Sequence, residues 1–105
     1  MEKMTNIYKI EKLPMVEELV TVLKKDKNIR IERIISAGQV SDWYDQSEEE
    51  YVILLEGRAT VLYADNTSIT LKKGDTLFIP AHKKHKISYT SESPACIWLC
   101  IFWEE

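Results

Sequence analysis

The chain has 105 residues, of which 45% are hydrophobic and 30% are charged, a balance typical of one globular domain and not of a disordered segment. Its formal net charge is −3 and its basic residues form no stripe, which argues against nucleic acid as a partner. The longest apolar run, residues 95–103, is far shorter than the roughly 20 residues of a membrane helix. Residues 1–6 are polar and lead into no signal-peptide core, so we expect a cytoplasmic protein without a membrane span.

The first element that the sequence predicts is a helix over residues 14–25. Pro14 suits a first helical position, and acidic residues near the start and lysines near the end match the helix dipole. Apolar residues recur at helical spacing, at Val16, Leu19, Val20 and Leu23. We therefore expect residues 1–27 to form an extension whose helix packs on the outside of a β-domain formed by residues 28–105.

From residue 28 onward the pattern changes to short strands. Residues 29–35 are β-branched and roughly alternate, and residues 51–55 form an apolar run that Gly57 ends. Further strands are predicted over residues 58–64, 67–71, 76–79, 85–90 and 95–103. Asp65 and Asn66 tolerate positive φ and form a good two-residue hairpin turn. Short strands separated by such turns are typical of a sandwich or barrel.

The last predicted strand is apolar on both faces, so we expect it to be covered twice. The barrel interior would cover one face, and a second subunit or the N-terminal helix would cover the other. Cys96 and Cys100 lie on one face but roughly 13 Å apart at about 3.3 Å per residue. This exceeds the Cα separation of about 7 Å that a disulfide tolerates, so both should be reduced, buried packing residues.

Two blocks bounded by turn residues, 38–57 and 74–85, carry the most specific pattern in the chain. Their spacing resembles the two sequence motifs of the cupin superfamily, and the resemblance covers about residues 28–103. The matching positions are Gly38, Glu50 and Gly57 in the first motif, and Gly74, Pro80 and His85 in the second. The resemblance implies an all-β, double-stranded β-helix (jelly-roll-like) barrel, often dimeric, so a homodimer is expected.

The departures from these motifs bear on function. The two histidine positions of the first motif are occupied by Tyr44 and Gln46, and the second-motif glycine is His82. The resemblance therefore implies only Glu50 and His85 as inherited metal ligands. Since the chain has two histidines, the usual site of three histidines and one glutamate is impossible.

Strand alternation nevertheless predicts that several polar side chains converge at one end of the barrel. The set is Tyr44, Gln46, Glu50 and His85. It could hold a divalent metal (Fe, Mn, Ni or Zn), and its oxygen-rich chemistry favours Fe, Mn or Mg over tightly bound Zn. If Asp45 or His82 turned inward, a site of two histidines and one carboxylate would form. The alternative is that Tyr44 and Gln46 close the barrel mouth by hydrogen bonds, with His85 accepting one and no metal present.

The remaining candidate residues have two interpretations each. Tyr44 or His82 could act as a catalytic acid or base, although His82 could equally be a solvated turn residue. Trp43, Tyr44 and Trp98 could line an apolar substrate pocket, or the two tryptophans could pack in the core or at a dimer interface. Glu50 begins an apolar strand and needs a partner if it is buried, which a metal or His85 would supply.

Three functions follow as hypotheses. The first is a small metal-dependent enzyme, such as an oxygenase, isomerase or lyase, that acts on a small organic molecule. The second is a non-catalytic small-molecule-binding or sensing cupin with a degenerate metal site. The third is a structural dimer without a ligand. The sequence favours the first two and does not specify the substrate, because one fold hosts many chemistries.

Overall fold

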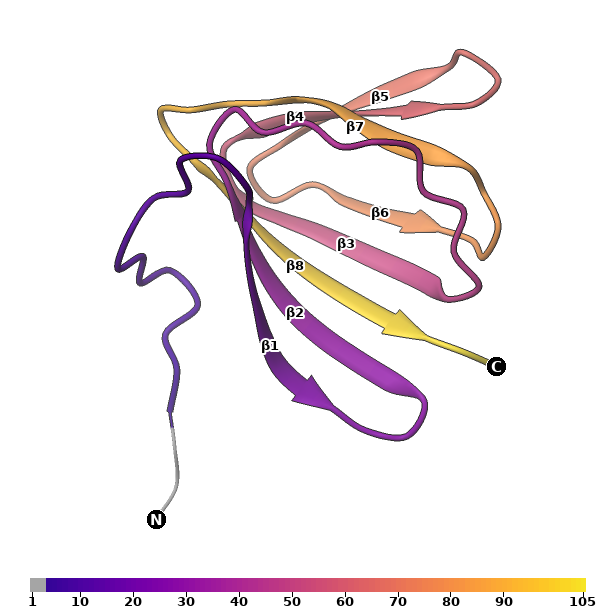
Figure 1. Ribbon diagram of the computed structural model, residues 1–105, viewed down its shortest axis with the longest axis horizontal. Helices are drawn as coiled ribbons and strands as arrows, with labels where there is room; N and C mark the ends of the chain where they lie inside the picture. The colour runs from indigo at the N-terminus through magenta and orange to yellow at the C-terminus, as the bar shows by residue number, and fades with distance from the viewer. Residues whose placement is uncertain (1–3) are drawn as a thin grey trace.

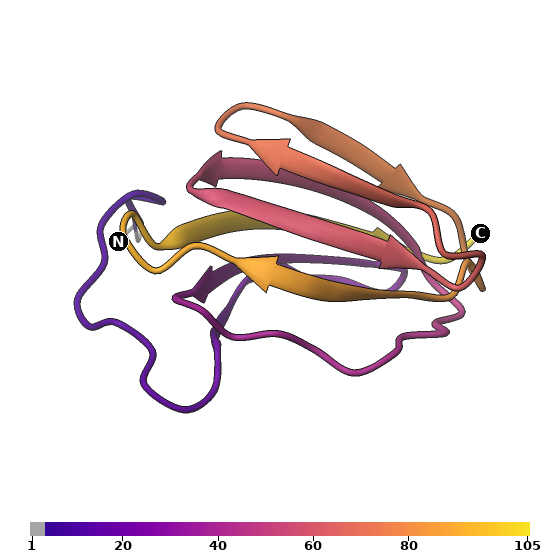
Figure 2. The ribbon, with the colours of Figure 1, turned by 90° about the horizontal axis from the view of Figure 1, so that it is seen from above.

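Two antiparallel sheets make up the protein, with β4, β5 and β7 above a fan of five other strands in Figure 1. The computed structural model describes residues 4–105, and these contain eight strands and no helix. The larger sheet has the order β1-β2-β8-β3-β6, and the smaller has the order β5-β4-β7. Seen from above, the N-terminal segment lies to one side of the strands (Figure 2). No helix in this described part of the chain could span a membrane.

Short turns join most of the strands, as their residue pattern predicts, and a longer loop over residues 37–48 joins β2 to β3. Their bounds are β1 Leu19–Lys25, β2 Ile29–Ser36, β3 Glu49–Glu56, β4 Arg58–Tyr63, β5 Ser68–Lys72, β6 Thr76–Ile79, β7 His85–Thr90 and β8 Cys96–Trp103. The hairpin turn between β4 and β5 is the predicted one, and Asn66 adopts a φ of 73° in it. The all-β prediction is therefore confirmed.

The predicted helix over residues 14–25 is wrong, because residues 19–25 form β1 instead. Val20, Thr21 and Val22 are β-branched and favour a strand. A helix of about 12 residues is marginal in water, whereas pairing with β2 satisfies the backbone of this segment along its length. Val20 and Val22 stay half exposed, so the apolar stripe is not buried as a helix would bury it. The larger sheet thus contains residues from both sides of the boundary predicted between residues 27 and 28.

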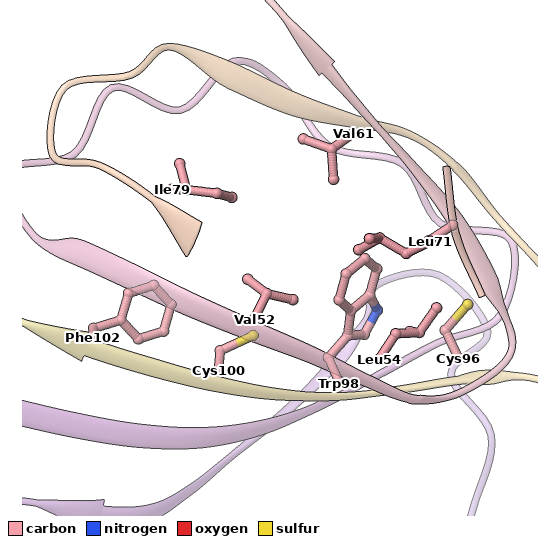
Figure 3. Packing of buried hydrophobic residues seen from close by; sticks show 10 residues of the cluster. Val52, Leu54, Val61, Leu71, Ile79, Cys96, Trp98, Cys100 and Phe102 are labelled. Atoms are coloured by element: carbon pink, nitrogen blue, oxygen red, sulfur yellow. The ribbon is translucent and has the colours of Figure 1, made fainter. Parts of the chain in front are cut away.

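The core lies between the two sheets and is filled by alternate side chains of the strands (Figure 3). Its buried members are Val52, Leu54, Ala59, Val61, Leu71, Ile79, Cys96, Trp98, Cys100 and Phe102. Four of these come from β8, the last strand. Cys96 and Cys100 are free and buried, which confirms their predicted packing role.

The opposite face of β8 belongs to the outer surface of the larger sheet. The pairing register places Ile31, Ile101, Tyr51 and Phe78 in one row across four neighbouring strands. Phe78 is 47% exposed and stacks on Trp103, with ring centroids 6.1 Å apart. The outer face is therefore apolar and, on β6, open to solvent.

Two glycines with the same backbone conformation provide a test of this packing. Gly57 and Gly74 have φ of 91° and 90°, but an added Cβ would lie 2.8 Å from the Cys96 Cα at Gly57 and meet nothing within 4 Å at Gly74. We expect Gly74→Ala to lower the free energy of unfolding by about 1–2 kcal/mol through backbone strain alone. Gly57→Ala should lower it by about 1–3 kcal/mol more, because the clash is with backbone. Urea unfolding measures both, and equal losses would contradict the packing at Gly57.

Candidate functional site

A cavity of about 210 Å³ lies against the core between the two sheets. Its apolar wall is formed by Val52, Val61, Ile79, Ile87, Trp98, Cys100 and Phe102, most of which Figure 3 labels. Its polar lining is formed by Glu18, Arg30, Glu32, Tyr44, Gln46, Glu50 and His85. An apolar cavity of about 150 Å³ can hold benzene, so this space suits a molecule of roughly one ring.

Glu50 and His85 reach the cavity because each lies near the start of a strand. Glu50 is the second residue of β3, opposite Ile79 on β6 and Phe102 on β8, and it shares the inward face with Val52. His85 is the first residue of β7. Because side chains alternate along each strand, both residues face inward, as the core residues do. They therefore place two polar groups beside the core at one end of the sandwich.

The His85 ring is held in one orientation by the backbone. Its Nδ1 lies 2.8 Å from the Lys83 carbonyl oxygen, which can only accept, so Nδ1 carries the proton. In neutral His85 the other nitrogen, Nε2, then presents a lone pair toward Glu50, with 3.9 Å between Nε2 and Glu50 Oε1. This distance is too long for a hydrogen bond. Within residues 4–105, Nε2 makes no hydrogen bond, although the side chain is only 3% exposed.

Glu50 is a buried carboxyl that holds its proton unusually strongly. The pKa of Glu50 is raised from 4.5 to about 7, mainly by burial and to a smaller extent by the charge of nearby Glu32. The Gln46 amide donates to Glu50 Oε1 at 3.1 Å and opposes this shift. Near neutral pH, Glu50 therefore exists in both its protonated and its ionised form, as an acid–base catalyst requires.

Tyr44 lies beside His85 through both backbone and ring contacts. Its N–H donates to the His85 carbonyl at 2.7 Å, and the His85 N–H donates back at 3.1 Å. The two ring centroids are 5.6 Å apart. Burial raises the pKa of the Tyr44 phenol, and the charge of Glu18 adds to the effect. The phenol therefore keeps its proton at neutral pH.

The structure brings five of the predicted site residues to this cavity and leaves two outside it. Those that line it are Tyr44, Gln46, Glu50, His85 and Trp98. His82 is exposed and its Nδ1 lies 2.9 Å from Asp45 Oδ1, with a φ of 62° where the cupin motif has glycine. Trp43 does not line the cavity and is 40% exposed, and the Lys86 ammonium lies 4.8 Å from its ring centroid.

Three charged residues of the lining were not predicted from the sequence. Arg30 and Glu32 lie on β2, and Glu18 directly precedes β1. In the pairing of β2 with β8, Arg30 lies opposite Phe102 and Glu32 lies opposite Cys100, and both of these β8 residues face inward. Knowledge of this strand register would therefore have predicted that Arg30 and Glu32 face the cavity. Glu18 accepts a hydrogen bond from Ser36 at 3.4 Å, and burial raises its pKa.

The donor set does not fit the metal site that the cupin resemblance implies. No group of three or more His, Cys, Asp and Glu side chains that could hold an ion occurs in the described part, residues 4–105. His85 is the single imidazole of the cavity lining. The Gln46 amide nitrogen also faces Glu50, which turns its oxygen, the atom that would bind a metal, away from that carboxyl.

Comparison with known proteins finds matches over most of the chain. The model of the family described as "Cupin domain" matches residues 32–102. An uncharacterized protein of Methanocaldococcus jannaschii is 34% identical over 91 residues, which are 84% of this chain and 72% of that protein.

Solved structures match as well. A Ralstonia eutropha JMP134 protein, provisionally assigned as a mannose-6-phosphate isomerase, superimposes with a TM-score of 0.91 and 30% identity, covering 99% of this chain and 100% of that one. A cupin superfamily protein of Desulfitobacterium hafniense DCB-2 has a TM-score of 0.77 and 21% identity, covering 90% and 84%. At that lower identity the similarity concerns the fold.

Proposed function

The chain belongs to the cupin family, and from this premise we propose that it binds a small organic molecule in the cavity and moves a proton on it. Glu50 and His85 act as the acid–base pair. One observation carries the proposal: a buried carboxyl with a pKa of about 7 faces an imidazole nitrogen that has no hydrogen-bond partner within residues 4–105, 3.9 Å away. Perturbed groups of this kind cluster at functional sites.

The reaction that suits this pair is proton transfer next to a carbonyl group. His85 Nε2 accepts the proton of the C–H bond while the protonated Glu50 carboxyl donates its own proton to the carbonyl oxygen, which gives an enol. The reverse transfer returns a proton from the solvent-exchanged His85 to the same carbon while the enol O–H returns its proton to Glu50, so nothing is oxidised or reduced. Tyr44, beside His85, is a second proton donor to the oxygen. His82, outside the cavity, has no part in this proposal.

Two features support this reaction. The apolar wall around Trp98 keeps water from the enol and strengthens the polar contacts of the substrate. The provisional isomerase assignment of the Ralstonia protein is of the same broad class, because an isomerase leaves the composition of its substrate unchanged.

Deuterium exchange tests the proposal without knowledge of the natural product. The protein in D2O is incubated with a panel of ring-sized ketones and aldehydes, and the loss of the C–H signal next to the carbonyl is followed by proton NMR. We expect at least one member to exchange faster than in buffer alone. If panel members bind but none exchanges, the site belongs to the alternative class of non-catalytic binding or sensing cupins, and the proton-transfer proposal is wrong.

Metal binding at Glu50 and His85 competes with this proposal, because their facing atoms are near enough to contact one ion. An ion at 100 times its dissociation constant would stabilise the protein by about 2.7 kcal/mol. We expect no such thermal shift with Fe, Mn, Ni or Zn, since residues 4–105 bring no group of three or more His, Cys, Asp or Glu side chains together. A shift that disappears in both Glu50→Gln and His85→Ala would establish the metal site instead.

We further propose that two copies pair through the outer face of the larger sheet. The apolar row that ends at Phe78 continues across β3 and β8 and would be covered by the same row of a second copy. Sedimentation should give about twice the chain mass of 12.3 kDa. Phe78→Lys should shift the protein toward the monomer, and a monomeric wild type at micromolar concentration would contradict the pairing.

A further inference from the structure

The cavity lining contains one permanently charged cation, and it is already engaged. Arg30 is the single Lys or Arg of the lining. It extends inward from β2, opposite Phe102, and its guanidinium carbon lies 4.3 Å from the centre of that ring. An anionic substrate would have to bind here, because guanidinium is the group that recognises carboxylates and phosphates in two-bond geometry.

Two carboxylates hold this guanidinium through three short hydrogen bonds. Arg30 Nε donates to Glu32 Oε2 at 2.8 Å. Nη1 and Nη2 donate to the two oxygens of Glu48 at 2.8 and 3.1 Å, the two-bond geometry that a substrate carboxylate or phosphate would need. The positive charge of Arg30 is therefore shared between two carboxylates. The guanidinium edge that carries Nη1 and Nη2 is occupied by Glu48.

The rest of the polar lining adds negative charge. Glu18 and Glu50 have no Lys or Arg within salt-bridge distance in the described residues 4–105. The lysine ammonium groups near this end of the sandwich lie over aromatic rings, Lys83 over Tyr63 and Lys86 over Trp43, and these lysines do not line the cavity. Burial raises the pKa of both carboxyls, and at Glu50 this effect outweighs the opposing charge of Arg30.

From this arrangement we infer that the ion pairs of Arg30 with Glu48 and Glu32 determine the substrate class. The cavity accepts small molecules that are uncharged or cationic and excludes carboxylates and phosphates. The inference rests on the proposed function, because it concerns the same cavity, and it names Glu48 as a specificity-determining residue that does not itself line the cavity.

The test compares the affinities of three compounds of similar size with one ring each: benzyl alcohol, benzylamine and benzoate. Each is titrated into the protein at low salt and pH 8, and binding is followed by tryptophan fluorescence and calorimetry. We expect benzyl alcohol and benzylamine to bind, and benzoate to bind at least about tenfold more weakly than benzyl alcohol, because like charges repel in a partly buried site. Benzoate binding as tight as that of the alcohol would overturn the inference and leave the proposed function standing. Absence of binding by all three would overturn both.

Glu48→Gln tests the specific role of the ion pair. It removes one of the two negative charges that pair with the Arg30 guanidinium. The difference in affinity between benzoate and benzyl alcohol should therefore narrow by roughly threefold to tenfold. Glu32→Gln is a second variant with the same expectation. The matched control is Glu56→Gln, which removes the carboxylate paired with Lys73 outside the cavity and should leave the difference unchanged. The assignment of Glu48 as a specificity-determining residue would be overturned by either of two results. One is an unchanged affinity difference between benzoate and benzyl alcohol in folded Glu48→Gln and Glu32→Gln. The other is an equal narrowing of that difference in Glu56→Gln.

Discussion

Replacing Glu50 with Gln is expected to slow the exchange of the substrate C–H proton by roughly 100-fold to 10,000-fold, the usual contribution of a positioned acid or base. Gln keeps the size of the side chain and an oxygen that can accept from Gln46, but it has no acidic proton to donate to a carbonyl. His85→Asn should lower the rate by a similar factor, because it removes the Nε2 lone pair. Proton NMR in D2O, under the conditions that give exchange with the wild type, measures both rates.

The neighbouring residue offers a matched control for this experiment. Glu49 has the opposite strand parity, does not line the cavity, and accepts a hydrogen bond from the Ala81 N–H at 2.8 Å. Glu49→Gln keeps an acceptor oxygen there and should change the exchange rate by less than about twofold. Wild-type exchange in a folded Glu50→Gln protein would remove Glu50 from the reaction.

The second large effect concerns stability as a function of pH. The pKa of Glu50 is about 7 in the folded protein against 4.5 for an ordinary glutamate, so between these values the folded state binds more protons than the unfolded state. The stability that this proton contributes is fully present below pH 4.5 and is lost as the pH rises to about 7. A difference of 2.5 pKa units corresponds to about 3 kcal/mol.

Comparison with Glu50→Gln isolates this contribution, because Gln does not titrate. From pH 4.5 to pH 8, the wild type should lose up to about 3 kcal/mol of unfolding free energy relative to the variant. Urea unfolding at several pH values measures the difference. A constant difference over this range would mean that Glu50 has an ordinary pKa in the folded protein.

The residues that could be predicted from the sequence are those whose position depends on local spacing. Gly57 and Gly74 mark turns with positive φ, and strand parity then directs Glu50 and His85 inward, because side chains alternate strictly along a strand. The same reasoning assigned Tyr44 and Gln46 to one end of the barrel, and both line the cavity.

The residues that could not be predicted depend on pairing between distant segments. The apolar spacing of residues 14–25 fits a helix, and only the hydrogen bonds of β1 to β2 favour the strand. Arg30 and Glu32 were missed because their inward position follows from pairing with β8, more than 60 residues away. Trp43 and His82 were placed near the site by sequence proximity, but they point to the surface of the loops that carry Tyr44 and His85.

Direct titration of the Glu50 carboxyl is the measurement on which the proposed proton transfer most depends. The carboxyl carbons of the glutamates are labelled with ¹³C, the Glu50 signal is assigned by its absence in Glu50→Gln, and its chemical shift is followed from pH 3 to pH 9. We expect an apparent pKa of about 7, because burial disfavours the charged carboxylate. A pKa near the ordinary glutamate value of 4.5 would show that Glu50 is fully ionised at neutral pH and is not the proton donor of this site.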